Sequence, residues 1–274
     1  MVMPRFGANL QQLFTLLKEK FSRDSILSLA IRLLDILEQI HSAGYTFNDL
    51  KLDNILLDLD CDVNDLASQD GDIFEKNNIN LVDFGFASRY TAEQDGAEEH
   101  IEKDKIDYFK GNMMFSSLSQ LKFYKTSRRD DLISLFYLMV YLFKGAKLPQ
   151  IELTSKMTVN EQFMVIRDAK QDHRTADLCF ENTQDLADLR REIFSYRFKD
   201  QPRYSLLRKM LWKLREKDAA AVDCTRSKSR RSTIKSNISS KSPSQVDSYD
   251  KMKSKLLNLT SLYTKDSLAT SASD

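Results

Sequence analysis

The stretch GYTFNDLKLDNILL, from residue 44 to residue 57, places the strongest constraint on what this chain can fold into. It sets two carboxylates, a lysine and an asparagine (Asp49, Lys51, Asp53 and Asn54) between a helical pattern and a short apolar run. Burial of such groups is costly unless each one finds a partner. A second stretch, NINLVDFGFAS, repeats the pattern with Asp83 directly after an apolar strand. We therefore expect the two stretches to satisfy each other's polar groups.

The hydrophobic pattern around these stretches predicts a mostly helical chain. Apolar residues recur at three- and four-residue steps from Ile26 to Ile40, which indicates a helix. Ser22 or Asp24 can cap its start, and Gly44 can end it. The other expected segments are strands at 55–57 and 79–82 around a polar excursion at 58–78, a long polar segment at 88–110, and helices at 130–143 and between 161 and 215. One small hairpin in a helical chain thus carries the polar groups on its flanking loops.

Composition narrows the class of protein. The 274 residues have a net charge of +1, which argues against a dedicated nucleic-acid binder. The three cysteines are far apart and form no CxxC pair, so neither a disulfide framework nor a zinc site is indicated. The N-terminal stretch lacks signal-peptide features, and the longest apolar run, 132–143, is too short to cross a bilayer. We expect an intracellular monomer, in the cytoplasm or nucleus, with no nucleic-acid or membrane partner.

The domain organisation follows from a change in composition near residue 218. Residues 218–274 are rich in Ser, Thr and Lys and contain one proline but no Trp or Phe, so they cannot easily bury a core. The prediction is one folded domain at 1–217 followed by a disordered tail at 218–274. The tail carries six cations with no acidic residue between them: Arg226, Lys228, Arg230, Arg231, Lys235 and Lys241. Two interpretations stay open, a solvated flexible tail and a basic address or docking segment.

The chemistry lies in two motifs. The sequence DLKLDN, beginning at Asp49, fits the protein-kinase catalytic loop D-L-x-x-x-N, and DFG, beginning at Asp83, fits D-F-G. Phosphoryl transfer needs positioning and charge neutralisation more than covalent help. Asp49 is then expected to accept the hydrogen bond of the substrate hydroxyl, and Lys51 to meet the transferred phosphoryl group. Asn54 and Asp83 are expected to hold Mg²⁺ against ATP.

Each motif alone is weak, since a helix or turn cap would also explain Asp49. Together they occur in the order of a kinase, each beside a predicted strand and after the predicted helix. The expected fold class is α+β and protein-kinase-like, mainly the helical C-terminal lobe.

A more specific resemblance begins at residue 126. The segment TSRRDDLISLFYLMVYLFKGAKLP is similar to a segment of the casein kinase 1 group, which includes the vaccinia-related and tau-tubulin kinases. FSYRFKDQPRYSLLRKMLWKL, from residue 194, resembles the end of that group's kinase domain. The resemblance runs from residue 1 to about residue 217. It implies an ATP-dependent, non-specific serine/threonine protein kinase, with Asp131 starting the central helix and anchoring the catalytic-loop backbone.

The resemblance also implies the nucleotide contacts. Met3 takes the gatekeeper position before the hinge. Pro4 to Phe6 take the hinge position, whose backbone groups would bond adenine. Pro4 has no N–H and can offer only its carbonyl, whereas the backbone amide of Phe6 remains available as a donor. Leu56 matches the residue that forms the floor under adenine.

For the protein substrate, the group's anion site is implied at Arg128 and Arg129, joined by Lys170 from a later loop. The activation segment, however, is acidic in this chain. It carries seven acids: Glu93, Asp95, Glu98, Glu99, Glu102, Asp104 and Asp107. Since surface charges interact over about 10 Å, these acids are expected to weaken a preference for acidic peptides, unless the loop swings clear of the substrate.

Departures from the family leave two hypotheses open. No glycine-rich loop or strand lysine is found, so the small N-terminal lobe is expected to be absent from this chain. Phe47 and Asn48 replace the usual His-Arg, and Asn112, which replaces a threonine, is expected to bond near Asp49. The intact motifs favour an active kinase, whereas the missing lobe favours a pseudokinase or scaffold. As written, the chain is expected to bind ATP weakly and to phosphorylate nothing, while a form extended through a small lobe is active.

Overall fold

The computed structural model describes residues 4–68, 71–94, 96–148, 151–172 and 186–229, and describes only the backbone of 94 and of 217–229. The helices are α1 (Leu10–Leu16), α2 (Arg23–Ser42), α3 (Val63–Ser68), α4 (Leu118–Leu121), α5 (Arg128–Phe143), α6 (Val159–Gln171), α8 (Ala187–Ser195) and α9 (Tyr204–Ser229). The antiparallel strand pairs are β1 (Tyr45–Thr46) with β4 (Ser88–Arg89), β2 (Ile55–Leu57) with β3 (Ile79–Leu81), and β5 (Thr91–Gln94) with β6 (Ala97–His100). Helices therefore dominate the described residues.

Helix α2 forms where the apolar periodicity predicts it. Of the two possible caps, Ser22 is used, and its side chain accepts a hydrogen bond from the amide of Ser25. The helix ends at Ser42, and Gly44 follows with a φ of 85°, a left-handed conformation that glycine adopts without steric cost. Its apolar side chains, such as Leu33 and Leu37, are fully buried.

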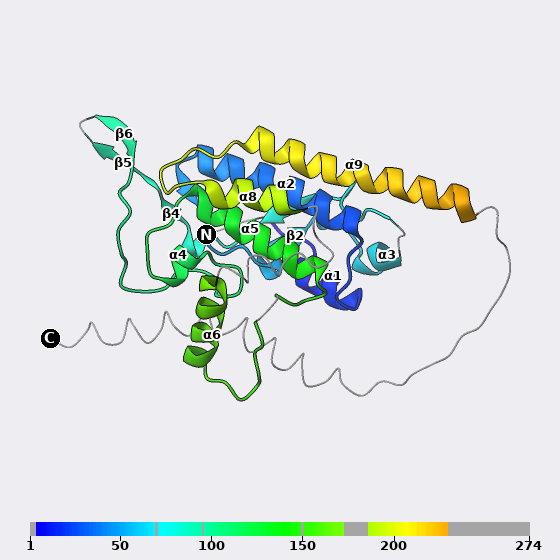
Figure 1. Ribbon diagram of the computed structural model, residues 1–274, viewed down its shortest axis with the longest axis horizontal. Coiled ribbons are helices and arrows are strands. Elements are labelled where there is room, and N and C mark those ends of the chain that lie inside the picture. Colours follow the sequence, from blue (N-terminus) through cyan, green and yellow to red (C-terminus); the bar gives the residue numbers. More distant parts are fainter. Residues whose placement is uncertain (1–3, 69–70, 95, 149–150, 173–185, 230–274) are drawn as a thin grey trace.

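The core lies between three long helices. α2 packs against both α5 and α9, and α9 runs alongside α2 in Figure 1. α5 is buried around most of its circumference, as its unbroken apolar run predicts. Within the described residues, no helix combines the length and the apolarity needed to cross a bilayer.

The β2–β3 hairpin matches the prediction, except that β3 ends at Leu81, one residue early. The chain before α1 lies beside β2, where the amide of Gly7 donates to Leu57 O at 2.9 Å and the amide of Leu57 donates to Ala8 O at 2.9 Å. A Cβ on Gly7 would lie 2.4 Å from the carbonyl oxygen of Asp58, so only glycine permits this approach. The expected hinge is thereby fixed to the hairpin.

Three segments differ from the sequence expectations. The segment 88–110 contains the β5–β6 hairpin, which protrudes from the helical body in Figure 1 and turns through Gly96, with a φ of 79°. The excursion at 58–78 contains the short helix α3. Helix α9 continues to Ser229, so the predicted domain boundary at 217 falls inside a helix; the alanines at 219–221 favour helix without needing a core. Residues 230–274 lie outside the described residues.

Candidate active site

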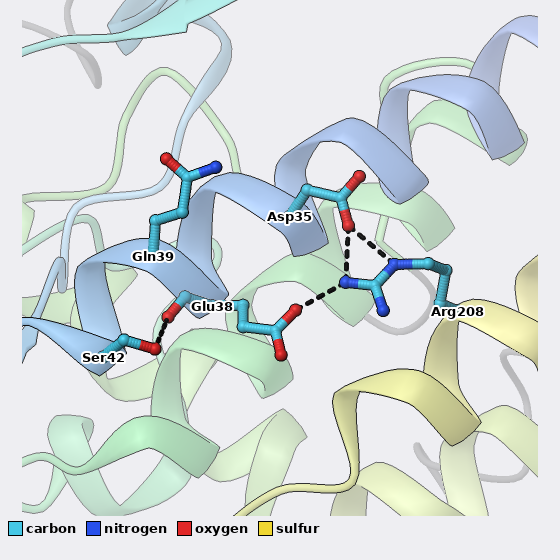
Figure 2. Close-up of a pocket in the computed structure, with 5 residues that line it drawn as sticks. All are labelled: Asp35, Glu38, Gln39, Ser42 and Arg208. Carbon is cyan, nitrogen blue, oxygen red and sulfur yellow. Dashed lines mark hydrogen bonds and ion pairs between the residues drawn. The ribbon is translucent and has the colours of Figure 1, made fainter.

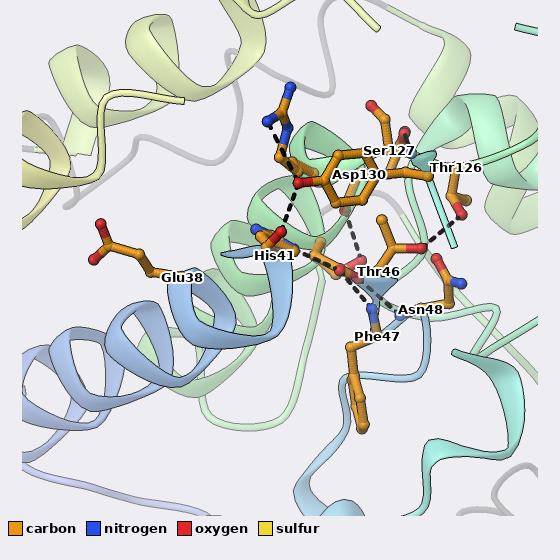
Figure 3. A network of polar contacts seen from close by, with 12 residues as sticks. Glu38, His41, Thr46, Phe47, Asn48, Thr126, Ser127 and Asp130 are labelled. Atoms are coloured by element: carbon orange, nitrogen blue, oxygen red, sulfur yellow. Dashed lines mark hydrogen bonds and ion pairs between the residues drawn. The ribbon is translucent and has the colours of Figure 1, made fainter. Parts of the chain in front are cut away.

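The backbone of the catalytic loop is hydrogen-bonded to Asp131, in the first turn of α5. Both carboxylate oxygens of Asp131 accept backbone hydrogen bonds, from Phe47 N at 2.7 Å and from Asn48 N at 2.8 Å. Asp131 is 1% exposed, so these bonds form away from water. Figure 3 shows Phe47 and Asn48 at this network, with His41 beside them. Asp131 thus occupies the anchoring position that the resemblance implies.

Asp49 lies directly after this anchor and is fully buried. Its Oδ2 is 2.8 Å from Lys51 Nζ and accepts a hydrogen bond from Asn54 Nδ2 at 2.9 Å. Burial raises the pKa of Asp49, an effect that Lys51 and Asn54 oppose and the negative charge of Asp83 reinforces. The other oxygen, Oδ1, is buried and has no hydrogen-bond partner among the described residues. It is the atom of this carboxylate left to accept a further hydrogen bond.

Asn54 and Asp83 meet at the end of the β2–β3 hairpin. The amide of Val82 donates to Asn54 O at 2.9 Å, which puts Asp83 next to Asn54. Asp83 adopts a left-handed conformation (φ 64°), accepts a hydrogen bond from Gly85 N at 3.2 Å, and is exposed. The side-chain Nδ2 of Asn54 donates to Asp49, so the side-chain oxygen of Asn54 is the atom that can bind a metal ion. One carboxylate and one amide oxygen fit Mg²⁺, a hard cation that prefers oxygen.

The replaced His-Arg pair has taken on packing and bridging roles. Phe47 is fully buried, and its ring meets the ring of Phe84 edge-on at 5.3 Å. Asn48 has a φ of 71° and donates from Nδ2 to Phe86 O at 2.8 Å. These contacts connect the catalytic loop to the D-F-G segment without an arginine.

Gly111 and Gln120 close the other side of the catalytic loop. Gln120 Nε2 donates to Asn48 O at 3.0 Å and to Lys110 O at 2.6 Å. Gly111 has a φ of 106°, and a Cβ there would lie 2.2 Å from Asn48 O. The expected bond from Asn112 toward Asp49 is not formed: its Oδ1 instead accepts from Met114 N and Phe115 N, at 2.8 and 3.2 Å. Asn112 therefore caps the turn formed by the residues that follow it.

The expected nucleotide contacts lie on the hinge and on β2. Pro4 is exposed and Phe6 is half-buried, directly before the backbone that pairs with β2. Leu56 in β2 is half-buried and lies opposite Asn9. The expected gatekeeper, Met3, lies outside the described residues.

The two arginines of the expected anion site are already engaged. Arg128 Nη2 donates to Lys199 O at 3.1 Å, and its guanidinium lies 4.7 Å from the centre of the Tyr90 ring. Arg129 Nη2 donates to Ser119 Oγ at 3.1 Å. Both side chains are half-buried. The two side chains therefore connect α5 to the segment before α9 and to α4, in addition to carrying positive charge.

Lys170, the third cation of the expected anion site, lies in the last turn of α6 and not in a loop as expected. Its ammonium donates to Met114 O and to Ser116 O, each at 2.7 Å, and lies 4.1 Å from the centre of the Tyr137 ring. The side chain is 8% exposed. Lys170 thus satisfies buried carbonyls of the segment before α4, because a buried ammonium needs such acceptors.

The acidic activation segment is partly neutralised. Glu98 pairs with Arg89 at 2.9 Å, and Glu102 forms a close ion pair with Lys199. Asp104 lies 3.6 Å from Lys125 Nζ. Lys199 and Lys125 lie outside the segment, so counting charges within it overstated its negative potential. Asp95 lies outside the described residues.

Sequence reasoning missed three side chains that hold the site: Gln120, and the pair His41 and Tyr204. His41 Nε2 lies 2.9 Å from Asp131 Oδ2, and His41 Nδ1 lies 2.6 Å from the hydroxyl of Tyr204. Tyr204 lies in the segment that resembles the end of the kinase domain, but no pattern in that segment points to His41. Each bond joins parts of the chain that are distant in sequence.

Comparisons with known proteins fit this geometry. The family model described as the protein kinase domain matches residues 2–228. A protein of Encephalitozoon cuniculi (strain GB-M1), named as a probable casein kinase I homolog, is 29% identical over 211 residues. That alignment covers 77% of this chain and 63% of the relative, so the chain spans less than two thirds of the relative's length.

Proposed function

This chain belongs to the protein kinase family, and from that membership we propose that it carries the helical lobe of an ATP-dependent serine/threonine kinase of the casein kinase 1 type. The proposed reaction moves the γ-phosphoryl group of ATP to serine and threonine hydroxyls of proteins. Because the matched relative is longer, activity, substrates and partners are proposed for the whole protein. The resemblance of the segments at 126 and 194 supports the casein kinase 1 type.

The observation that carries the proposal is the buried cluster of Asp49, Lys51 and Asn54. Asp49 Oδ1, the oxygen without a partner, is proposed to accept the hydrogen bond of the substrate hydroxyl and orient it for attack. Lys51, held 2.8 Å from Oδ2, brings a positive charge to where negative charge develops. Asn54 fixes the same carboxylate from the other side. Positioning and charge are what phosphoryl transfer requires of a protein.

We propose that Asn54 and Asp83 hold Mg²⁺, which neutralises phosphate charge when bound. Two observations support this pairing. Asp83 is exposed, and the amide of the preceding residue, Val82, donates to the backbone oxygen of Asn54. For the adenine, we propose the backbone from Pro4 to Phe6, the floor at Leu56 and the gatekeeper Met3. We further propose that the whole protein works as an intracellular monomer, in cytoplasm or nucleus, where ATP is available.

A pseudokinase or scaffold is the second candidate, because Lys51 and Asn54 satisfy Oδ2 of the buried Asp49 with contacts from the protein itself. Such a cluster also stabilises the lobe in a protein that transfers no phosphate. Transfer and nucleotide binding must therefore be measured separately.

The test compares Asp49→Asn with Asp83→Asn in the whole protein. Both variants should lower kcat for a casein peptide by about a thousandfold. Asp83→Asn should also weaken Mg–ATP binding measured by calorimetry, since it removes a metal ligand, whereas Asp49→Asn should leave that binding unchanged. Asp188→Asn, on the outer face of α8, is the control and should change neither quantity.

Wild-type rates in both variants would refute the kinase assignment. Binding of Mg–ATP by the wild type without any transfer would favour the pseudokinase instead.

A further inference from the structure

The first residue of α9 reaches the network that suspends the catalytic loop. Tyr204 is 7% exposed and His41, in the last turn of α2, is 1% exposed. The hydroxyl of Tyr204 lies 2.6 Å from His41 Nδ1, and His41 Nε2 lies 2.9 Å from Asp131 Oδ2. That same Oδ2 accepts the amide of Phe47. A continuous chain of hydrogen bonds therefore runs from α9 to the catalytic loop.

The direction of these bonds follows from the acceptors. An ionised Asp131 is acceptor-only, so His41 Nε2 must donate to it. A neutral imidazole then accepts at Nδ1, which makes the hydroxyl of Tyr204 the donor. Burial raises the pKa of Tyr204, so this hydroxyl keeps its proton. Tyr204 fixes the tautomer and the orientation of His41.

Other contacts already hold α9 in place. Arg208 Nε donates to Asp35 at 2.7 Å, and its Nη2 pairs with Glu38, as Figure 2 shows. Leu207 and Leu211 are buried against the core. The hydroxyl of Tyr204 is therefore not required to attach the helix, and what it adds is a constraint on His41.

The loop that receives this constraint is strained. Asn48 sits in the left-handed region with a φ of 71°, a conformation that residues other than glycine seldom adopt without contacts that hold it. Its amide is held by Asp131 Oδ1 at 2.8 Å, directly before Asp49. Asp131 is therefore one of the contacts that hold Asn48 in this conformation, and through Asn48 it bears on the position of Asp49.

We propose that Tyr204 is a positioning residue for Asp49 and acts through His41 and Asp131. The proposal assigns to the last helix a direct part in setting the catalytic loop. Its kinetic consequence rests on the proposed kinase function, but its structural consequence does not.

The test is Tyr204→Phe, which removes the hydroxyl and keeps the ring. In the 274-residue chain, hydrogen exchange at the amides of Phe47 and Asn48, read by NMR, should become about fivefold faster relative to core amides of α2. Fivefold corresponds to the loss of one net hydrogen bond. In the whole protein, kcat should fall by a similar factor while KM for ATP stays unchanged.

Tyr196→Phe is the matched control. Its hydroxyl donates to Glu192 and accepts a hydrogen bond from Arg203 N at 3.0 Å. The deletion is therefore chemically equal, but among the described residues this hydroxyl contacts neither His41 nor Asp131. It should leave the exchange of Phe47 and Asn48 and the value of kcat unchanged.

Wild-type exchange in Tyr204→Phe, or equal acceleration in Tyr196→Phe, would overturn the proposal. Faster exchange in Tyr204→Phe but not in Tyr196→Phe would support the proposal even if the wild type transfers no phosphate. Absence of transfer would count only against the proposed kinase function.

Discussion

The catalytic loop and the D-F-G segment provide the two halves of one site, yet their surroundings are opposite. Asp49 is 0% exposed, and Lys51 and Asn54 are 9% and 4% exposed, each with partners inside the lobe. Asp83 is exposed, and Phe84 is 51% exposed. The core of this lobe therefore organises the side expected to receive the substrate hydroxyl. The side expected to face metal and nucleotide presents its groups to solvent.

The largest effect that could break this contrast concerns stability. Asp131→Ala should lower the free energy of unfolding by about 3–5 kcal/mol, because it leaves two buried amides and His41 without their acceptor. Asp83→Ala should change it by about 0.5 kcal/mol or less, since the carboxylate is exposed. Urea denaturation of both variants measures the difference. Equal losses would mean that the D-F-G segment is as firmly held as the catalytic loop.

A pH dependence of Asp49 sharpens the contrast further. Burial raises its pKa above 3.8 in the folded protein, so the charged form is disfavoured by folding. The free energy of unfolding of the wild type therefore falls as the pH rises from the pKa of Asp49 in the unfolded chain to its pKa in the folded protein. Below the unfolded pKa the protonated carboxyl causes no such loss. Asp49→Asn should therefore be more stable than the wild type at pH 7, and the difference should vanish below pH 3.8. Asp83→Asn, at an exposed carboxylate, is the control. If Asp49→Asn were less stable than the wild type at pH 7, the ion pair with Lys51 would contribute more to stability than burial of the charge costs.

The smallest effect lies beyond the D-F-G segment, in the exposed β5–β6 hairpin. Glu93 and Glu99 are exposed and have no ion pair among the described residues, whereas Glu98 and Glu102 do. Changing Glu93 and Glu99 to glutamine should raise the relative preference of the whole protein for acidic peptides by about twofold, since salt screens such charges. A peptide array compares the two proteins. A tenfold shift would show that the hairpin lies against the substrate.

Local patterns allowed the central part of the fold and site to be predicted. The three- and four-residue periodicity predicted α2, and its start was predicted at Ser22 or Asp24, because both signals lie within one element. The β2–β3 hairpin followed from two apolar runs with polar flanks. The pairing of those strands then brings Asn54 of the D-L-x-x-x-N motif beside Asp83 of the D-F-G motif.

The remaining features depend on partners that are distant in the sequence. The strands 91–94 and 97–100 lack apolar alternation, so the β5–β6 hairpin has no hydrophobic signal. Lys170 has the charge of a surface residue, and its burial is explained by distant partners such as the carbonyls of Met114 and Ser116 and the ring of Tyr137. His41 and Tyr204 are 163 positions apart, a separation across which no periodicity carries information.

Position 111 illustrates a different limit, on the freedom of the sequence itself. The catalytic loop and the segment after the hairpin touch there through backbone atoms, with no space for a Cβ between Gly111 and Asn48 O. A Cβ there would also lie 2.6 Å from Gln120 Nε2, the side chain that bridges Asn48 O and Lys110 O. Position 111 therefore admits glycine alone, because of the space around it and its φ of 106°, and not because of any role in the chemistry.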